Sequence, residues 1–242
     1  VMKITLEKYI SFILVVLLHS GCLAESPPRV FLGFIDYSLS ASTFEANNKD
    51  RLADRFLRLW SHEMSAPDQL MVYPIHLLTE TASSLYRKIK PNSSGDLNGA
   101  SLTAKSNHEF LSEFKEGVFE ETKIPDNVRM GTNLYPILRK IQRHSTNTKT
   151  RVLIVSDMIH EFQDEQLNEV FFSKNAPDPR ELAYEKCQEM DMVNKLSNAE
   201  VSLLFPGTID GDINDEVIRP LIITFWEELF TLAGATVEVE DL

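Results

Sequence analysis

The sequence predicts a single α/β domain built on a doubly wound, mostly parallel sheet with helices on both faces. Short apolar runs recur along the chain, and continuous runs of this kind are typical of parallel strands buried on both faces. Amphipathic helical segments lie between the runs, and alternating strands and helices favour a parallel sheet. The 242 residues are enough for one domain with a substantial core.

The first predicted strand covers residues 31–35 and leads into an oxygen-rich loop, which contains Asp36, Ser38 and Ser40. Residues 50–64 follow as a predicted amphipathic helix, because apolar side chains recur there at helical spacing. Together these segments form the first half of a βα unit.

The next predicted strand covers residues 70–75, and its Pro74 weakens the strand or places it near an edge of the sheet. Residues 93–106 are rich in Ser, Asn, Gly and Lys, and we expect them to form a surface excursion. Residues 109–121 carry apolar side chains at helical spacing and predict a helix that packs back onto the sheet.

The second half of the chain repeats the alternation of strands and helices. Thr132 lies in a loop before a predicted helix at 134–143, and the apolar strand 151–155 leads directly into Ser156 and Asp157. The remaining predicted elements are a helix at 182–196, a strand at 200–205, a helix at 218–232 and a strand at 236–239.

Three loops therefore place oxygen-bearing side chains beside apolar elements. Carboxylates and hydroxyls are the ligands that Mg²⁺ and similar hard cations prefer, and ligands of open α/β sheets bind at the carboxyl ends of the strands. Each residue alone also suits an ordinary role, as a helix cap or a turn residue. The ordered set favours a metal site over separate caps.

In this order the loops resemble a von Willebrand factor A domain, a Rossmann-like fold, with a metal-ion-dependent adhesion site. The matching residues are Asp36, Ser38, Ser40, Thr132 and Asp157, and the resemblance covers residues 28–240. It implies a non-enzymatic module that binds Mg²⁺, or Mn²⁺ or Ca²⁺, and through that cation a protein partner presenting an Asp or Glu carboxylate. The sequence departs from the family pattern at Met130 and Met158, where the family often has glycine.

Two alternatives stay open at this point. The chain also suits a scaffold or assembly subunit whose metal site is structural or vestigial. A weaker resemblance is to Mg²⁺-dependent phosphohydrolases of the haloacid dehalogenase type, in which Asp36 would be the nucleophile and Asp157 would help to hold the metal. That family needs an acidic residue where this chain has Ser38. His160 and Glu161, just beyond Asp157, are interpreted as ordinary loop residues rather than as an acid–base pair or extra ligands.

The first residues predict an export signal. Lys3 and Lys8 precede a short apolar run, so residues 1–22 are interpreted as a signal peptide, residues 23–29 as a linker and residues 30–240 as the domain. Cys22 then resembles the lipidated cysteine of a bacterial lipoprotein, and the alternative is ordinary cleavage near Ala24. The expected location is extracytoplasmic, periplasmic or at the cell surface.

The net charge and the cysteine content limit the classes of partner and the role of the cysteines that we expect. The 24 Lys and Arg against 36 Asp and Glu give a formal net charge of −12, which argues against nucleic acid and against an anionic membrane surface. Contact with a membrane is therefore expected only through a lipid anchor. The second cysteine, Cys187, is expected to be a buried structural thiol.

Overall fold

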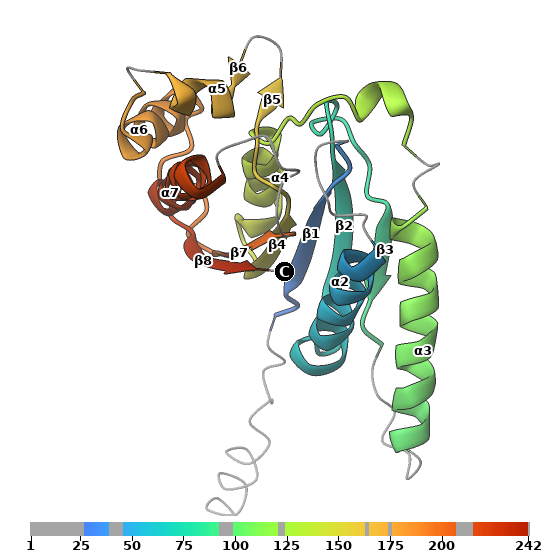
Figure 1. Cartoon of the computed structure of the whole chain (residues 1–242). Helices are drawn as coiled ribbons and strands as arrows, with labels where there is room; N and C mark the ends of the chain where they lie inside the picture. Colours follow the sequence, from blue (N-terminus) through green and yellow to red (C-terminus); the bar gives the residue numbers. More distant parts are fainter. Residues whose placement is uncertain are drawn as a thin grey trace, which may run out of the picture.

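The computed structural model describes residues 27–38, 46–91, 99–120, 124–162, 165–173, 176–206 and 215–241. Its main sheet has the strand order β3-β2-β1-β4-β7-β8, and every neighbouring pair is parallel except β2 with β3 (Figure 1). The predicted doubly wound, mostly parallel α/β fold is confirmed. The strands are β1 Val30–Asp36, β2 Gln69–Ile75, β3 Tyr86–Ile89, β4 Thr150–Val155, β7 Ala199–Phe205 and β8 Thr236–Asp241.

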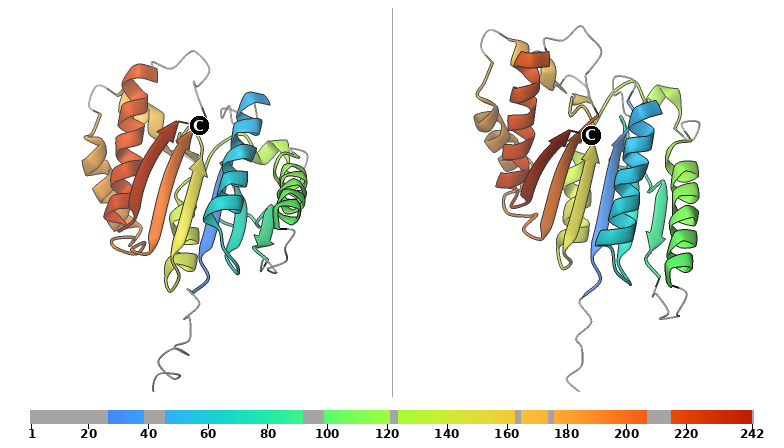
Figure 2. Two further views of the ribbon diagram at one scale, coloured as in Figure 1. Left: turned by 90° about the horizontal axis from the view of Figure 1, so that it is seen from below. Right: turned by 60° about the horizontal axis from the view of Figure 1, so that its bottom comes forward.

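Helices cover both faces of the sheet, and Figure 2 shows α2 and α3 on one face with α7 on the other. Each face has its own apolar core, one shared with α2 and α3 and the other with α4, α6 and α7. The helices are α2 Ala46–Arg58 with a π-helical extension Leu59–Glu63, α3 Gly99–Val118, a 3-10 turn Asp126–Val128, α4 Pro136–Ser145, α5 Leu167–Phe172, α6 Pro179–Glu189 and α7 Asp215–Leu232. A two-stranded ladder, β5 Glu161–Phe162 with β6 Glu165–Gln166, lies outside the main sheet.

The central strand β1 approaches α2 closely because it carries a glycine at its middle. A Cβ added at Gly33 would lie 2.6 Å from the Phe56 ring, so a larger residue there would push the helix away. Aromatic rings then fill the space between α2 and α3, with the centroids of Phe56 and Phe114 4.7 Å apart and those of Trp60 and Phe110 4.9 Å apart. This packing fixes β1, and therefore the loop that follows it.

The expectation that Pro74 lies near an edge is confirmed. Strand β2 is second from the edge, and β3 pairs with it only as far as Val72. The Val72 carbonyl accepts from Leu85 on the β3 side, whereas the Ile75 carbonyl accepts from Tyr37 on the β1 side. Backbone groups alternate in direction along a strand, so the nitrogen of Pro74 points toward the β3 side of β2. The pairing with β3 ends at Val72, so proline costs no hydrogen bond of the sheet at this position.

Several elements differ from the prediction. The helix expected at 109–121 begins already at Gly99, so the second half of the expected excursion is helical. The helix expected at 182–196 covers Pro179–Glu189 instead, since Asp178 caps its start and Asp191 and Asn194 adopt positive φ angles beyond its end. The short edge strand β3 was not predicted, because two of its four residues are charged.

The buried carboxylate of Asp68, just before β2, holds the residues that lead into β1. Asp68 accepts hydrogen bonds from the backbone N–H of Arg29 at 2.8 Å, from the guanidinium of Arg29 at 2.7 Å and from the backbone N–H of Ser65 at 2.8 Å. Burial alone would raise the pKa of Asp68, but these hydrogen bonds and the guanidinium charge outweigh it and hold the pKa below its usual range. Asp68 therefore fixes the entry of the chain into β1.

The predicted export signal, with Cys22, lies outside the described residues, and it stays a prediction together with the proposed domain boundaries. Among the helices that the structure describes, none is long and apolar enough to cross a bilayer. The second cysteine, Cys187, belongs to α6 and is buried in the core that α6 shares with α7, as expected.

Candidate metal centre

The carboxyl ends of β1 and β4 bring the first and the third of the predicted loops together. These strands are parallel neighbours with Ile35 opposite Val155, so Asp36 and Ser156 leave the sheet side by side. The hydroxyl of Ser156 donates a hydrogen bond of 2.5 Å to Oδ2 of Asp36. The sheet itself thus places the Asp36 carboxylate beside the segment that carries Asp157.

The carboxylate of Asp36 is wholly buried and held from both sides. Its Oδ1 accepts from the backbone N–H of Ser38 at 2.8 Å, and its Oδ2 accepts from Ser156. Burial raises the pKa of Asp36, the hydrogen bonds from Ser156 and Ser38 oppose this rise, and the nearby Glu161 carboxylate adds to it. Two engaged oxygens and no exposure are typical of a fixed carboxylate rather than an accessible nucleophile.

Thr132 reaches the same edge through a backbone pairing with the first residue of β5. Its N–H donates to the Glu161 carbonyl at 3.0 Å, and its carbonyl accepts from the Glu161 N–H at 2.9 Å. The preceding Gly131 permits this approach. The Thr132 side chain is fully buried, and its hydroxyl oxygen makes no hydrogen bond to any part of the chain that the structure describes.

Asp157 follows Ser156 in a tightly fixed turn. Its Oδ1 accepts from the Ile159 N–H at 3.0 Å, and the Ser156 hydroxyl accepts from the Met158 N–H at 2.9 Å. Met158 has a φ of 62°, a left-handed conformation that glycine adopts most easily. Its buried side chain and a hydrogen bond of 2.8 Å from the Trp226 indole to its carbonyl hold this conformation. The departure from glycine at this position therefore leaves the turn intact.

A further clamp joins the loop after β1 to its surroundings. The Nε of Arg129 donates to the Tyr37 carbonyl at 2.9 Å, and the buried Tyr37 hydroxyl donates to the carbonyl of Val118 at the end of α3. The segment that presents Ser38 is thus attached both to the Thr132 loop and to a helix. Such attachment limits the motion of candidate ligands before any ligand binds.

The structure brings Asp36, Ser38, Thr132 and Asp157 to the same edge of the sheet, and their role as ligands stays a prediction. Ser40 lies outside the described residues. Sequence reasoning missed Ser156, whose position directly before a carboxylate at the end of a strand was the available signal. It interpreted Glu161 as an ordinary loop residue, whereas the Glu161 carboxylate lies near enough to Asp36 to raise its pKa.

The His160 side chain packs and hydrogen-bonds within the fold, and its interpretation as an ordinary loop residue stays a prediction. Its Nδ1 accepts a hydrogen bond of 3.2 Å from the Leu134 N–H just before α4, and its ring lies 4.3 Å from that of Tyr135. A ring nitrogen that accepts from the backbone is unprotonated, and the side chain is buried. These contacts fix the start of α4 next to Thr132.

The donor set fits a hard divalent cation. Two buried carboxylates, Asp36 and Asp157, lie with the hydroxyls of Ser38 and Thr132 at one edge, and buried negative charge calls for compensation by a cation. The described residues contain no cluster of three or more His, Cys, Asp or Glu side chains placed to hold a metal. A cation here would accordingly depend on hydroxyl oxygens and water as well as on carboxylates, as Mg²⁺ sites commonly do.

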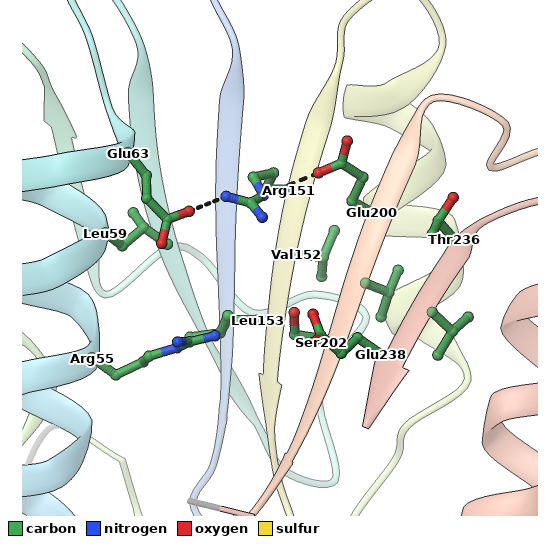
Figure 3. Close-up of a pocket in the computed structure, with 12 residues that line it drawn as sticks. Arg55, Leu59, Glu63, Arg151, Val152, Leu153, Glu200, Ser202, Thr236 and Glu238 are labelled. Atoms are coloured by element: carbon green, nitrogen blue, oxygen red, sulfur yellow. Dashed lines mark hydrogen bonds and ion pairs between the residues drawn. The ribbon is translucent and has the colours of Figure 1, made fainter. Parts of the chain in front are cut away.

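A cavity of about 120 Å³ lies elsewhere, between α2 and the amino-terminal halves of β4, β7 and β8 (Figure 3). Arg151 points into it and forms ion pairs with Glu63 of the α2 extension and with Glu200 of β7. None of the predicted site residues lines this cavity. The candidate metal centre and the cavity are therefore separate features at opposite ends of the strands.

We expect Gly131→Ala to disturb the centre through the backbone. A Cβ at this position would lie 2.8 Å from the Glu161 carbonyl oxygen and 2.8 Å from Cδ2 of Leu77, so the Thr132 loop must move away from β5. Such overpacking typically costs about 1 to 3 kcal/mol. Urea unfolding checks the cost, with Gly117→Ala in α3 as the matched control, where the nearest contact is a Tyr86 ring atom at 3.2 Å. Equal stabilities of the two variants would contradict the expectation.

Comparisons with known proteins found similar solved structures at low sequence identity. No protein-family model and no curated protein sequence matches this chain. Similar solved structures include the SpRpn10 VWA domain (9% identity, 88% of each chain, TM-score 0.43) and human COPII-coat protein Sec24c (9% identity, 88% of this chain and 29% of that one, TM-score 0.45). A third is mussel byssus proximal thread matrix protein 1 with a zinc-occupied MIDAS motif (12% identity, TM-score 0.38).

The match to the byssus protein includes 88% of this chain and 44% of the byssus protein. The chain therefore spans less than half the length of the byssus protein and of Sec24c. The order of its strands and the helices on both faces make it a doubly wound, mostly parallel α/β domain, with the candidate site at the carboxyl edge of the sheet.

Proposed function

We propose that this protein is an extracytoplasmic protein-binding module whose binding depends on a divalent cation, Mg²⁺ or alternatively Mn²⁺ or Ca²⁺. The proposed ligands are Asp36, Ser38, Ser40, Thr132 and Asp157. The partner is a protein that presents an Asp or Glu carboxylate to the cation, and contact with a membrane is limited to a lipid anchor on Cys22. Neither catalysis nor binding of nucleic acid belongs to this proposal.

The buried hydroxyl of Thr132 is the observation that carries the proposal. A buried hydroxyl without a hydrogen-bond partner costs about 1 to 3 kcal/mol, and Thr132 has none within the described ranges. A valine of the same shape would avoid that cost. A cation held beside the neighbouring buried carboxylates would give this oxygen a partner, and this supports the proposal.

Other hydrogen bonds in the centre hold the proposed carboxylate ligands in place. The Ser156 and Ser38 hydrogen bonds fix the orientation of Asp36, and the turn at Ile159 fixes that of Asp157. A bound cation would offset the burial of these charges and supply an electrophilic position for an oxygen of the partner's carboxylate. The chain supplies only two carboxylates in this set, so the cation would keep net positive charge toward the partner.

The decisive experiment is Thr132→Val, for which we expect opposite effects on stability and on cation binding. Without cation, the variant should be more stable than the wild type by about 1 kcal/mol, because an unpaired buried hydroxyl is removed. Its affinity for Mg²⁺ and Mn²⁺, measured by calorimetry, should fall at least about tenfold, as one ligand is lost. Urea unfolding in chelator measures the stability.

The matched control is Thr79→Val, also at a buried threonine. The Thr79 hydroxyl donates to the His76 carbonyl at 2.6 Å and accepts from the His76 N–H at 2.9 Å. This variant should lose stability and keep its cation affinity. Saturable cation binding that Thr132→Val leaves unchanged would overturn the proposed ligand set, and absence of binding in the wild type would favour a scaffold with a vestigial site.

A further inference from the structure

Strand β8 forms an open edge of the main sheet. It is the outermost strand, paired with β7 on one side, and no residue that the structure describes pairs with its other side (Figure 2). Its six residues make it longer than the opposite edge strand β3, which has four. The backbone N–H and C=O groups along such an edge can pair with a strand of another chain.

The face of β7 and β8 that lies toward α2 is polar. Successive side chains of a strand point to opposite faces of the sheet, and Glu200, Ser202, Thr236 and Glu238 line the cavity beside α2 (Figure 3). From β7 only Leu204, and from β8 no described residue, belongs to the apolar core between the sheet and α2. This part of the sheet is therefore open to a polar partner along the edge of β8.

Carboxylates outnumber cations on this open face. Two guanidinium groups and four carboxylates lie there, namely Arg55, Arg151, Glu63, Glu200, Glu238 and Glu240. Glu240 pairs with Arg55 of α2 at 2.8 Å, and Arg151 serves two of the other carboxylates. Glu238, in the middle of β8, is exposed and forms no ion pair within the described part of the chain. A basic side chain beside β8 would supply the missing cation.

The other face of β8 is apolar. Val237 and Val239 are half-buried and pack against the core that contains α7. A strand added to the edge would place alternate side chains next to these valines and the others next to Glu238 and Glu240. The strand that fits this edge therefore alternates basic and apolar residues.

We propose that the outer edge of β8 binds an extended segment of a partner protein as an additional strand, in which Lys or Arg alternates with apolar residues. The net charge of −12 favours a basic partner. It disfavours a second copy of this chain, because two paired β8 edges would bring carboxylates together. The inference goes beyond the proposed function and does not rest on it, since the cavity beside β8 and the candidate metal centre lie at opposite ends of the strands.

The test uses three blocked hexapeptides as probes, titrated into the protein at one fixed ionic strength. They are acetyl-Lys-Val-Lys-Val-Lys-Val-amide, acetyl-Glu-Val-Glu-Val-Glu-Val-amide and acetyl-Lys-Lys-Lys-Val-Val-Val-amide. We expect the alternating lysine peptide to bind at least about tenfold more tightly than either of the others. The glutamate peptide has the opposite charge, and the third peptide has the same composition and charge without the alternation.

Glu238→Lys should reverse the preference for charge. It should weaken binding of the alternating lysine peptide about tenfold and strengthen binding of the glutamate peptide, because the central cross-strand pair changes sign in both cases. The matched control is Glu227→Lys on the exposed surface of α7, which changes the net charge equally and should leave the preference as it is.

Methylation of the peptide nitrogens tests the strand pairing itself. Two versions of the alternating lysine peptide carry N-methyl groups on either the odd or the even residues. Only every second amide of an added strand faces β8, so one version should lose binding and the other should keep it. Binding that survives in both versions would overturn the added strand.

The remaining outcomes also decide the proposal. Equal binding of the two lysine peptides, or a preference that Glu238→Lys leaves unchanged, would overturn it. Binding of the alternating peptide should be the same in Mg²⁺ and in excess chelator, and a requirement for Mg²⁺ would assign the peptide to the metal centre instead. Failure of the protein to bind Mg²⁺ would overturn only the proposed function. Self-association that the lysine peptide reverses would assign the edge of β8 to a second copy of this chain and contradict the proposal.

Discussion

Trp226→Ala is expected to cost about 3 to 5 kcal/mol of unfolding free energy, the range for a buried tryptophan cut back to alanine. The side chain is buried on α7 among the rings of Tyr135, Phe225 and Phe230, at centroid distances of 5.5, 5.1 and 6.1 Å. Its indole N–H also donates to the Met158 carbonyl at 2.8 Å. The variant therefore loses both packing and the contact that fixes the turn after Asp157.

Trp226→Phe separates these two losses. Phenylalanine keeps most of the buried ring but has no N–H, so the Met158 carbonyl loses its donor at a cost of about 1 to 3 kcal/mol. Urea unfolding of the wild type and both variants gives the free energies, and cation titration reports on Asp157. A loss below about 1 kcal/mol in Trp226→Ala would contradict the packing described here.

Asp68→Ala is the second change with a large expected effect, about 2 to 4 kcal/mol at pH 7. It removes the acceptor for two backbone N–H groups, of Arg29 and Ser65, and for the Arg29 guanidinium. The guanidinium side chain is 35% exposed, so water offsets part of its loss, and the estimate stays below that for a fully buried ion pair. Asp50→Asn is the control, because Asp50 forms an exposed ion pair with Lys115 and should change stability little.

The same carboxylate predicts a dependence on pH. The pKa of Asp68 is below its usual range in the folded protein, despite burial, because of the hydrogen bonds and charge of Arg29 and the Ser65 N–H. Its contribution is therefore fully present above the ordinary carboxyl pKa of about 4 and is lost as the pH falls through the lower, folded-state value. The stability difference between wild type and Asp68→Asn, measured by urea unfolding from pH 7 to pH 3, should shrink toward acid. A constant difference would contradict this assignment.

The parts of the fold that could be predicted from the sequence are the elements with a clear pattern of buried apolar residues. Strands β1, β4 and β7 are buried on both faces, so their apolar runs are long and easy to recognise. Strand β3 escaped prediction because it lies at an edge, where pairing with β2 rather than burial holds it. The start of α3 was not predicted because its residues 103–109 are exposed or half-buried, and the apolar side chains that pack into the core come later, at Phe110, Phe114 and Val118.

The candidate site was predictable as a set of loops but not as a set of contacts. The positions of Asp36, Thr132 and Asp157 follow from the strands and helices that precede or follow them. The bond from Ser156 to Asp36 depends on β1 and β4 being neighbours, which periodicity does not encode. The left-handed Met158 was not predictable either, because the tertiary contact with Trp226 stabilises a conformation that methionine alone disfavours.

The bond between Ser156 and Asp36 joins residues 120 positions apart, and this separation has a kinetic consequence. Contacts of such long range form slowly, after the strands that carry them have paired. The candidate centre accordingly comes into existence only when β1 and β4 lie together, and a nascent chain that ends before β4 has no such centre. Any binding that depends on it is then restricted to molecules that have completed the sheet, and the bound ligand in turn stabilises those molecules by mass action.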